Sequence, residues 1–340
     1  MRKVIVIAEA GVNHNGSLDI AIELIKAAAK SGADYIKFQT FITELNISRT
    51  AKKAQYQLKN TKGIDDSQFE MVKNLELSFE NFAYLNTICK QEGIGFLSTA
   101  FDLPSLDFID SLNPDYLKIP SGEITNKLLL EQIALKQRKI ILSTGMSDLN
   151  EIRWAINILE KNGLNREEIT VLHCNTEYPT PFQDVNLKAM NTIANELEVK
   201  IGYSDHTLGI EVPIAAVAMG ATIIEKHFTL SKEMSGPDHI ASLEPDEMTL
   251  MINGIRNIEK AISGSGLKEV SASELKNIQI ARKSIHIIKD LDKGSILQRD
   301  DLVMLRPGDG ISPIYIDNVI GKAAIRNLKA GAKITWKDLE

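Results

Sequence analysis

Cysteine is scarce in this 340-residue chain, which contains only Cys89 and Cys174. Two cysteines are too few for a disulfide framework or for a thiolate metal site. The longest nearly uncharged apolar run, residues 212–224, is shorter than the ~20 residues that a membrane-spanning helix needs. The apolar stretch near the N-terminus, residues 4–8, is too short for a signal peptide. We therefore expect a cytoplasmic protein without a membrane partner.

An excess of positive charge is also missing. The chain has 39 Lys and Arg against 45 Asp and Glu, which gives a net charge of −6, and no cluster of Lys and Arg reverses this balance. Because a nucleic-acid surface needs such a cluster, we expect no nucleic-acid partner. Apolar residues (44%) and charged residues (25%) occur at the levels of an ordinary soluble globular protein.

Short apolar runs alternate with longer amphipathic segments through the first 262 residues. Eight runs predict buried parallel strands, at residues 4–8, 35–38, 95–98, 116–119, 140–143, 170–173, 200–203 and 222–225. Helices are predicted at residues 18–31, 79–92, 103–111, 127–135, 149–162, 187–197, 211–219 and 245–262. This order predicts an α/β protein with a (β/α)8 TIM barrel, a fold that takes ~250 residues.

Two parts of the chain depart from this alternation. Residues 41–77 are long for a connection and polar in their middle, which on the active face of a barrel is typical of a substrate-handling lid. A Gly/Ser-rich stretch then opens a polar linker. We predict a barrel domain at residues 1–262, a linker at 263–282 and a small module of short strands at 283–340.

Two histidines stand just beyond the ends of neighbouring predicted strands, His206 after the seventh and His227 after the eighth. The carboxyl ends of barrel strands form the face where chemistry takes place. Two imidazoles at adjacent strand ends could hold one divalent cation and leave positions open for a substrate. The alternative is a pair of buried structural histidines.

Lysines and hydroxyl groups occur at the same rim. Lys37 and Lys118 lie in apolar strand runs, and the hydroxyl residues at strand ends include Ser121, Ser143, Thr144 and Ser204. Ammonium charge combined with hydroxyls and backbone amides is suited to a phosphorylated anion. Surface lysines and turn-forming hydroxyls are the alternatives.

Carboxylates complete the rim. Glu9, Glu123 and Glu225 follow or end predicted strands, so they could orient a lysine or a histidine, or one could act as an acid–base group. Asp238, in a Ser-Gly-Pro-Asp turn after the last strand, could reach a polyol substrate. A turn without a role in binding explains Asp238 equally well.

Together these motifs resemble those of the bacterial sialic acid synthases, and the likeness covers nearly the whole chain. The motifs are Glu9-x-Gly11-x-Asn13-His14-Asn15-Gly16, Lys37-Phe38-Gln39-Thr40, Lys118-Ile-Pro-Ser121-Gly-Glu123, Ser143-Thr-Gly-Met146, His173-Cys-Asn-Thr-Glu-Tyr178-Pro-Thr-Pro181, Ser204-Asp-His206, Glu225-Lys-His227 and Gly236-Pro-Asp238. The tail, with Lys293-Gly294, Arg306-Pro-Gly-Asp-Gly310 and Gly321-Lys322, resembles the antifreeze-like SAF domain of these enzymes, a β-clip fold.

The resemblance implies a condensation of phosphoenolpyruvate with an N-acyl hexosamine, with release of phosphate and formation of a nine-carbon 2-keto acid. It implies that His206 and His227 bind a divalent metal, usually Mn2+, with Mg2+ or Co2+ as alternatives. The residues implied for phosphoenolpyruvate are Lys37, Thr99, Lys118, Ser121, Ser143, Asn175, Thr176 and Ser204, and those for the sugar are Gln39, Glu123, Tyr178, Asp238 and Arg306. The residues implied for catalysis are Glu9, Glu123 and His227. Arg306 would come from the other subunit of a domain-swapped homodimer.

The chain also departs from the family pattern. Ala100 stands where the familiar motif Ser-Thr-Pro-Phe has proline, and Phe38 stands where some relatives have histidine. Which of Asn175 and Thr176 contacts phosphate stays open.

Three functions are expected, in this order. The first is an N-acetylneuraminate synthase, which uses N-acetylmannosamine. The second is an N,N'-diacetyllegionaminate synthase, which uses 2,4-diacetamido-2,4,6-trideoxymannose. The third is a non-catalytic barrel that binds sugar or phosphate.

Overall fold

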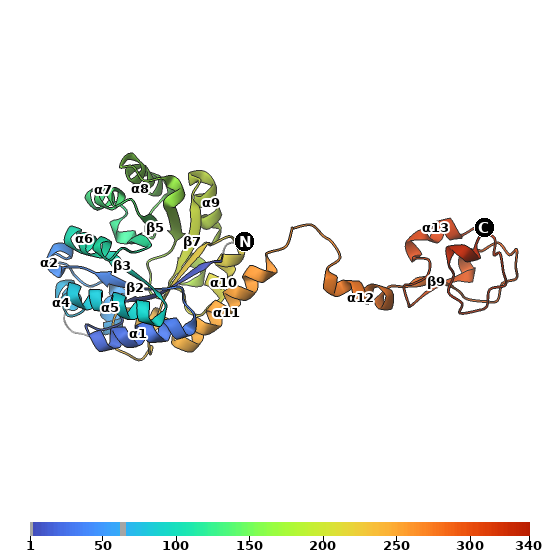
Figure 1. Cartoon of the computed structure of the whole chain (residues 1–340), viewed down its shortest axis with the longest axis horizontal. Coiled ribbons are helices and arrows are strands. Elements are labelled where there is room, and N and C mark those ends of the chain that lie inside the picture. Colours follow the sequence, from blue (N-terminus) through green and yellow to red (C-terminus); the bar gives the residue numbers. More distant parts are fainter. Residues whose placement is uncertain (1–2, 62–65) are drawn as a thin grey trace. The chain divides into compact units, whose positions relative to one another are not determined.

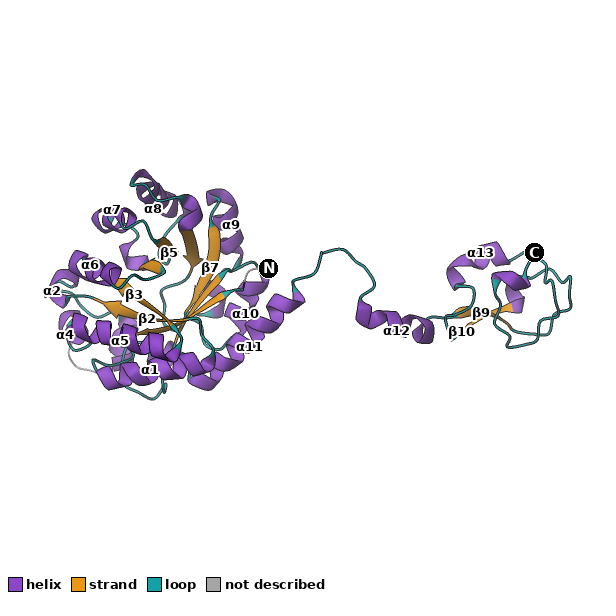
Figure 2. Cartoon of the chain, in the orientation of Figure 1, coloured by secondary structure: helices purple, strands orange, loops and turns teal. Residues whose placement is uncertain are grey.

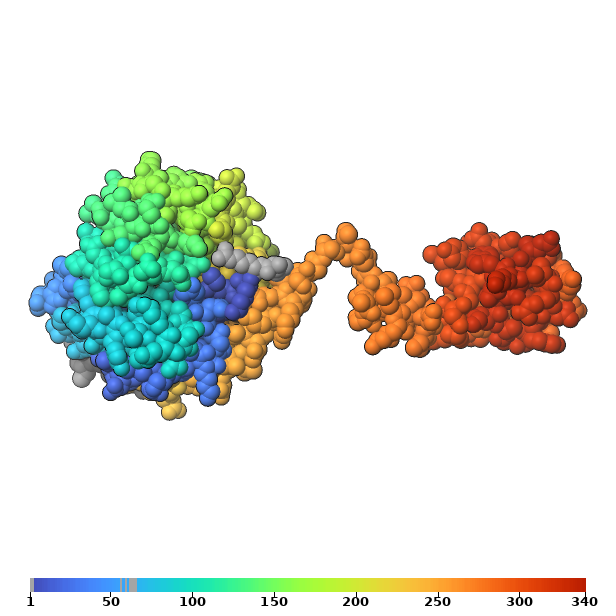
Figure 3. Space-filling view, viewed as in Figure 1, coloured from blue at the N-terminus to red at the C-terminus, as the bar shows by residue number. Residues whose placement is uncertain are grey.

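The computed structural model describes residues 3–61 and 66–340, and the chain divides into two compact units, Met1–Gly264 and Ser265–Glu340 (Figure 1). Lys62 and Asp65, which belong to the polar middle of the 41–77 segment, lie outside the described residues. Each unit packs around a hydrophobic core of its own. Figure 3 shows the surface of the chain coloured by residue number.

The first unit is a closed barrel of eight parallel strands whose order in space is their order in the chain. The strands are β1 (Ile5–Gly11), β2 (Tyr35–Thr40), β3 (Gly95–Ala100), β4 (Tyr116–Ile119), β5 (Lys139–Ser143), β6 (Ile169–His173), β7 (Lys200–Asp205) and β8 (Ile223–His227). β8 pairs with β1 and closes the barrel. The predicted TIM barrel is therefore confirmed.

Helices pack around these strands (Figure 2). They are α1 (Leu18–Ser31), α5 (Phe79–Glu92), α6 (Leu103–Ser111), α7 (Lys127–Leu135), α8 (Leu149–Lys161), α9 (Lys188–Leu197), α10 (Glu211–Ala218) and α11 (Pro245–Ala261). Local signals fix their ends: Ser17 accepts from the Ile20 amide at the start of α1, and Gly32 ends that helix at φ 85°.

Side-chain alternation divides the barrel interior into an apolar layer and a polar layer. The apolar layer consists of Ile7, Leu97, Tyr116, Ile141, Leu172 and Ile223. Gly202 is needed within it, because an added Cβ would lie 2.4 Å from Leu172 Cδ2 and 2.5 Å from the Ile223 carbonyl oxygen. Residues two positions further along each strand point inward again, nearer the carboxyl ends. Glu9, Thr99 and Glu225 are among them.

The described residues of the 41–77 segment form three short helices, α2 (Thr43–Asn46), α3 (Gln55–Thr61) and α4 (Gln68–Lys73). Ser67 caps α4 by accepting from the Glu70 amide. Phe69 is buried, and the Arg49 guanidinium lies 4.7 Å from the centre of its ring. These helices are too short to produce a clear helical period in the sequence.

The second unit contains α12 (Ala272–Ala281), the antiparallel strands β9 (Ser284–Ile287) and β10 (Leu302–Leu305), and α13 (Ile316–Val319). Its core consists of Ile285, Ile287, Leu297, Ile311, Val319, Ala324, Leu328 and Ile334. Within the described parts of both units, no helix has the length and apolar character to cross a membrane.

One buried ion pair lies on the outer side of the strands. Lys226 on β8 and Asp205 on β7 have fully buried side chains, with Nζ 2.6 Å from Oδ2. Lys226 also donates to the Thr207 carbonyl, and Asp205 accepts from the Thr207 hydroxyl at 3.0 Å. Because Lys226 alternates with Glu225 and His227, this pair points toward the helices while those two residues point into the barrel.

Replacing Lys226 with methionine is expected to lower the free energy of unfolding by ~3–5 kcal/mol, because it leaves the Asp205 carboxylate buried without its cation. Urea unfolding followed by circular dichroism measures this. The control is Lys232→Met, which breaks a partly exposed pair with Glu247 and should cost less than ~1 kcal/mol. Equal losses in the two variants would contradict the prediction.

Candidate active site

A cavity of about 550 Å³ opens at the carboxyl ends of the barrel strands, a size within the usual range for small-molecule sites. Its wall also includes residues of the 41–77 segment, among them Asn46, Gln57 and Gln68. The predicted site residues that line it are Glu9, Lys37, Gln39, Thr99, Lys118, Ser121, Glu123, Ser143, Thr176, Tyr178, Ser204, His206, His227 and Asp238. The structure therefore brings fourteen predicted residues together from all eight strand ends.

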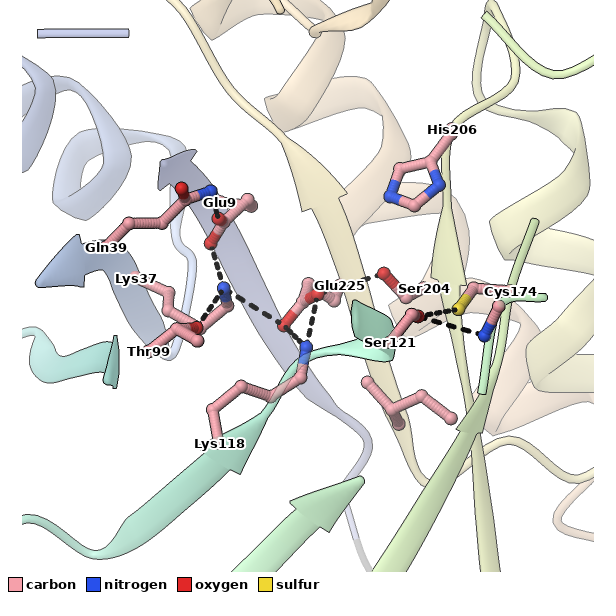
Figure 4. A network of polar contacts seen from close by, with 12 residues as sticks. Glu9, Lys37, Gln39, Thr99, Lys118, Ser121, Cys174, Ser204, His206 and Glu225 are labelled. Carbon is pink, nitrogen blue, oxygen red and sulfur yellow. Dashed lines mark hydrogen bonds and ion pairs between the residues drawn. The ribbon is translucent and has the colours of Figure 1, made fainter. Parts of the chain in front are cut away.

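Glu225 lies at the centre of a buried polar network on the cavity floor (Figure 4). Its carboxylate accepts from Lys118 Nζ at 2.9 and 3.1 Å and from the Ser204 hydroxyl at 2.9 Å. Lys37 Nζ lies 3.8 Å from the same carboxylate, 2.6 Å from Glu9 Oε2 and 3.1 Å from the Thr99 hydroxyl. Two lysines and two glutamates are thus held together at the bottom of the cavity, with their side chains almost completely buried.

The two carboxylates differ in their protonation. Burial alone would raise the pKa of Glu225, but Lys118 and Lys37 outweigh this effect and hold it at about 2. Burial raises the pKa of Glu9 to about 7, although Lys37 acts in the opposite direction. Glu225 is therefore ionised at neutral pH and keeps the lysines in place. Glu9 can exchange a proton near neutrality.

Two further hydroxyls, those of Ser121 and Ser143, lie at the ends of β4 and β5 and line the same cavity. The Ser121 hydroxyl accepts from the Gly145 amide at 2.9 Å and lies 3.3 Å from Cys174 Sγ. Gly145 permits this close approach, since a Cβ there would lie 2.9 Å from the Ser121 hydroxyl oxygen and 2.5 Å from Thr176 Cγ2. The Ser143 hydroxyl is buried and has no hydrogen-bond partner. This arrangement leaves a hydroxyl ready to donate to a ligand on the cavity floor.

His206 and His227 face each other with ring centres 5.3 Å apart, and Tyr178 packs against both rings at 4.2 and 5.4 Å. Burial lowers the pKa of His206 to about 4 and that of His227 well below its usual value, so both imidazoles are neutral at pH 7. His206 Nδ1 donates to the Asn175 carbonyl, while His227 Nδ1 is buried without a hydrogen-bond partner. Neutral imidazoles with a nitrogen to spare fit a divalent cation.

The surroundings limit what the chain can supply to such a cation. Within residues 3–61 and 66–340, no group of three or more His, Cys, Asp or Glu is arranged to hold a metal. Asp238 Oδ2 lies 4.0 Å from His227 Nδ1, and burial raises the pKa of Asp238 to about 6. A cation at this pair would therefore keep most of its coordination positions for substrate or water.

Two predicted residues lie elsewhere. Asn175 does not line the cavity, because its side chain accepts from the Glu177 amide at 2.8 Å and from the Thr180 hydroxyl at 3.3 Å. Thr176 lines the cavity instead; its contact with phosphate stays a prediction. Arg306 belongs to the second unit, where its Nε donates to the Ala281 carbonyl at 3.0 Å.

Glu225 was predicted at the rim of the barrel, but not as the centre of the network. The signal was present, because Glu225 is two residues before His227 on one strand and therefore points to the same side. The cavity residues of the 41–77 segment carried no such signal.

Comparison with known proteins identifies the family of the chain. The sequence model of the NeuB family matches residues 24–268, and that of the SAF domain matches residues 282–340. The chain belongs to the NeuB family. It is therefore an enzyme, a phosphoenolpyruvate-dependent synthase that forms a carbon–carbon bond, and the alternative of a non-catalytic barrel is wrong.

Relatives of known name extend over the whole chain. The N,N'-diacetyllegionaminic acid synthase of Campylobacter jejuni is 53% identical over 97% of this chain and 98% of its own length. The enzyme of the same name from Legionella pneumophila is 48% identical over 98% and 94%. The solved structure of an N-acetylneuraminic acid synthetase from Leptospira borgpetersenii is 35% identical, covers 82% of this chain and 90% of its own, and superposes with a TM-score of 0.72.

Proposed function

We propose that this NeuB-family enzyme is an N,N'-diacetyllegionaminate synthase. It would condense phosphoenolpyruvate with 2,4-diacetamido-2,4,6-trideoxymannose, release phosphate and form a nine-carbon 2-keto acid. The observation that carries the proposal is the full-length identity of 53% and 48% to two synthases of that name, against 35% to the N-acetylneuraminic acid synthetase. The similarity favours this sugar over N-acetylmannosamine, the substrate of the function placed first in the sequence analysis.

The cavity floor supports the binding of phosphoenolpyruvate. Lys37 and Lys118 supply buried positive charge, and the hydroxyls of Thr99, Ser121, Ser143 and Ser204 face the same space. An anion bound here would replace part of the contact that the lysines make with Glu9 and Glu225. Its charge would be balanced in a site of low dielectric, where such pairing is strong.

The histidine pair supports a metal-assisted reaction. His206 and His227 would hold a divalent cation. Mn2+ is the first candidate, and Mg2+ and Co2+ are the alternatives. Bound there, the cation would withdraw electrons from the aldehyde oxygen of the open-chain sugar. Tyr178 packs against both rings and would keep their orientation fixed.

The remaining residues would position the sugar and stabilise charge. Gln39, whose amide nitrogen lies 3.4 Å from Glu9 Oε1, would contact the sugar together with Glu123, Tyr178 and Asp238. Glu9 would stabilise the positive charge that develops at the enol ether carbon after attack on the aldehyde. Because its pKa is about 7, Glu9 could also hold or release a proton during addition of water.

Arg306 would contribute from the SAF domain of a second subunit in a domain-swapped homodimer, against the N-acyl group. The linker at 263–282 supports this idea, since it separates the barrel from the SAF domain matched at 282–340. The homodimer and the cytoplasmic location stay predictions.

The proposal is tested by measuring phosphate release from phosphoenolpyruvate with each hexose in turn. We expect kcat/KM for 2,4-diacetamido-2,4,6-trideoxymannose to exceed that for N-acetylmannosamine by at least ~10-fold, since a site built around polar groups of its substrate rejects analogues that lack them. The control is the same assay without hexose, which should release no phosphate. A higher kcat/KM with N-acetylmannosamine would contradict the proposal and would favour an N-acetylneuraminate synthase.

A further inference from the structure

One side of the cavity is apolar, in contrast to its charged floor. We call this side the apolar wall, and its residues are Val12, Phe41, Met71, Val72, Leu75 and Phe101. Val12, Phe41 and Leu75 are buried, and the rings of Phe41 and Phe101 meet edge to face with centres 6.3 Å apart. The six side chains form a cluster of their own, separate from the core between strands and helices.

The apolar wall lies further from the barrel floor than the anion network does. Val12, Phe41 and Phe101 are each the first residue after β1, β2 and β3. They follow Glu9, Lys37 and Thr99 by three, four and two residues, which at ~3.3 Å per residue places them up to roughly 7–13 Å beyond the network. The apolar wall therefore faces the part of a ligand that is remote from the reacting atoms on the floor.

The helical part of the wall is held in place by polar contacts. Glu76 Oε2 accepts from the Thr43 amide at 2.9 Å and from its hydroxyl at 2.6 Å. Asn60 donates to the Pro237 carbonyl at 2.7 Å and so ties the 41–77 segment to the loop after β8. Met71 and Val72 thus present their side chains from a fixed position, as a binding surface requires.

Binding is favoured when an apolar group of the ligand covers an apolar surface of the cavity, because both surfaces are then removed from water. Phosphoenolpyruvate has no such group to offer, since its only apolar carbon is the one that reacts at the floor. A six-carbon sugar whose aldehyde carbon C1 lies at the histidine pair directs its opposite end, C6, away from the floor. In a 6-deoxy sugar that end is a methyl group.

We propose that the apolar wall binds the C6 methyl group and selects 6-deoxy hexoses over hexoses with a C6 hydroxyl. The inference rests on the proposed function, which supplies the class of sugar. It concerns C6 alone, whereas the two named substrates differ at C4 as well as at C6. Burial of a hydroxyl against these six side chains would leave it without a hydrogen-bond partner. Binding of the methyl group would cover the wall.

Four hexoses separate the two questions: N-acetylmannosamine, its 6-deoxy form, 2,4-diacetamido-2,4-dideoxymannose and 2,4-diacetamido-2,4,6-trideoxymannose. Within each pair that shares C4, the methyl form should have a kcat/KM ~10–100-fold higher than the hydroxymethyl form, the usual range for a small change against an apolar pocket. Comparison of sugars that share the C6 group but differ at C4 tests the proposed function alone. Equal values for methyl and hydroxymethyl forms in both pairs would overturn the wall's role, whichever C4 group is preferred.

Variants then assign the preference to the wall. Val72→Thr keeps the shape of the side chain and replaces a methyl group with a hydroxyl, and Met71→Gln places a polar amide of similar length at the neighbouring position. Each should reduce the methyl preference by about fivefold or more. The matched control is Glu70→Gln on the same helix, whose side chain is exposed, and it should keep the full preference. An unchanged KM for phosphoenolpyruvate shows that the floor is intact. A methyl preference that persists in both wall variants would overturn the proposal.

Discussion

Replacing Lys118 with methionine is expected to lower kcat/KM for phosphoenolpyruvate by ~10³-fold. Lys118 donates twice to Glu225 and faces the space where the anion would bind. The substitution removes a buried cation from the ligand. It also takes away the main charge that lowers the pKa of Glu225, and leaves this buried carboxyl group beside the ligand's own negative charge. A charged contact of this kind is worth ~3–5 kcal/mol, and each 1.4 kcal/mol is about tenfold in rate or affinity.

The expected loss must be separated from a loss of folding. Lys118→Met alone should also destabilise the barrel, because Glu225 loses its nearest cation, so the variant is paired with the double substitution Lys118→Met, Glu225→Gln. The double variant should recover most of the stability in urea unfolding but not the activity. Lys127→Met, an exposed lysine on α7, serves as the neutral control. A loss of less than about tenfold for Lys118→Met would remove this lysine from the anion site.

The barrel could be predicted from the sequence because its strands are buried on both faces and therefore read as continuous apolar runs. The same runs located the rim residues, since a polar side chain that points inward near the carboxyl end of a barrel strand lines the cavity. His206, Lys37 and Ser204 were found in this way. The alternation that brings Glu225 and His227 inward also sends Lys226 outward, and this difference follows from position alone.

Other features depend on contacts between distant segments. The 41–77 segment contributes four residues to the apolar wall, two of them, Met71 and Val72, from α4, a helix of only six residues, and tertiary packing rather than local periodicity holds so short a helix. The role of Asn175 is a different case. Its side chain accepts from the amide two residues later, a turn that asparagine favours, so the sequence did contain a reason to prefer Thr176 as the cavity residue.

The double substitution His206→Ala, His227→Ala is expected to abolish binding of Mn2+ to the barrel and to reduce turnover by at least ~10³-fold, the scale on which loss of electrophilic stabilisation acts. Since burial lowers the pKa of both imidazoles, they are unprotonated at pH 7 and proton competition does not weaken the site there. Calorimetric titration with Mn2+ measures binding, and phosphate release with and without a chelator measures turnover.

A matched histidine keeps this test specific. His14 is equally buried, and burial lowers its pKa to about 4 as well, but its Nδ1 accepts from the Gly16 amide and the residue does not line the cavity. His14→Asn should therefore retain Mn2+ binding, whereas the double variant should not. Binding of Mn2+ and full activity that survive in the double variant would place the metal elsewhere and would remove both histidines from the reaction. The reaction would then need another electrophile to make the sugar aldehyde reactive, and Lys37 is the buried cation that the floor could offer.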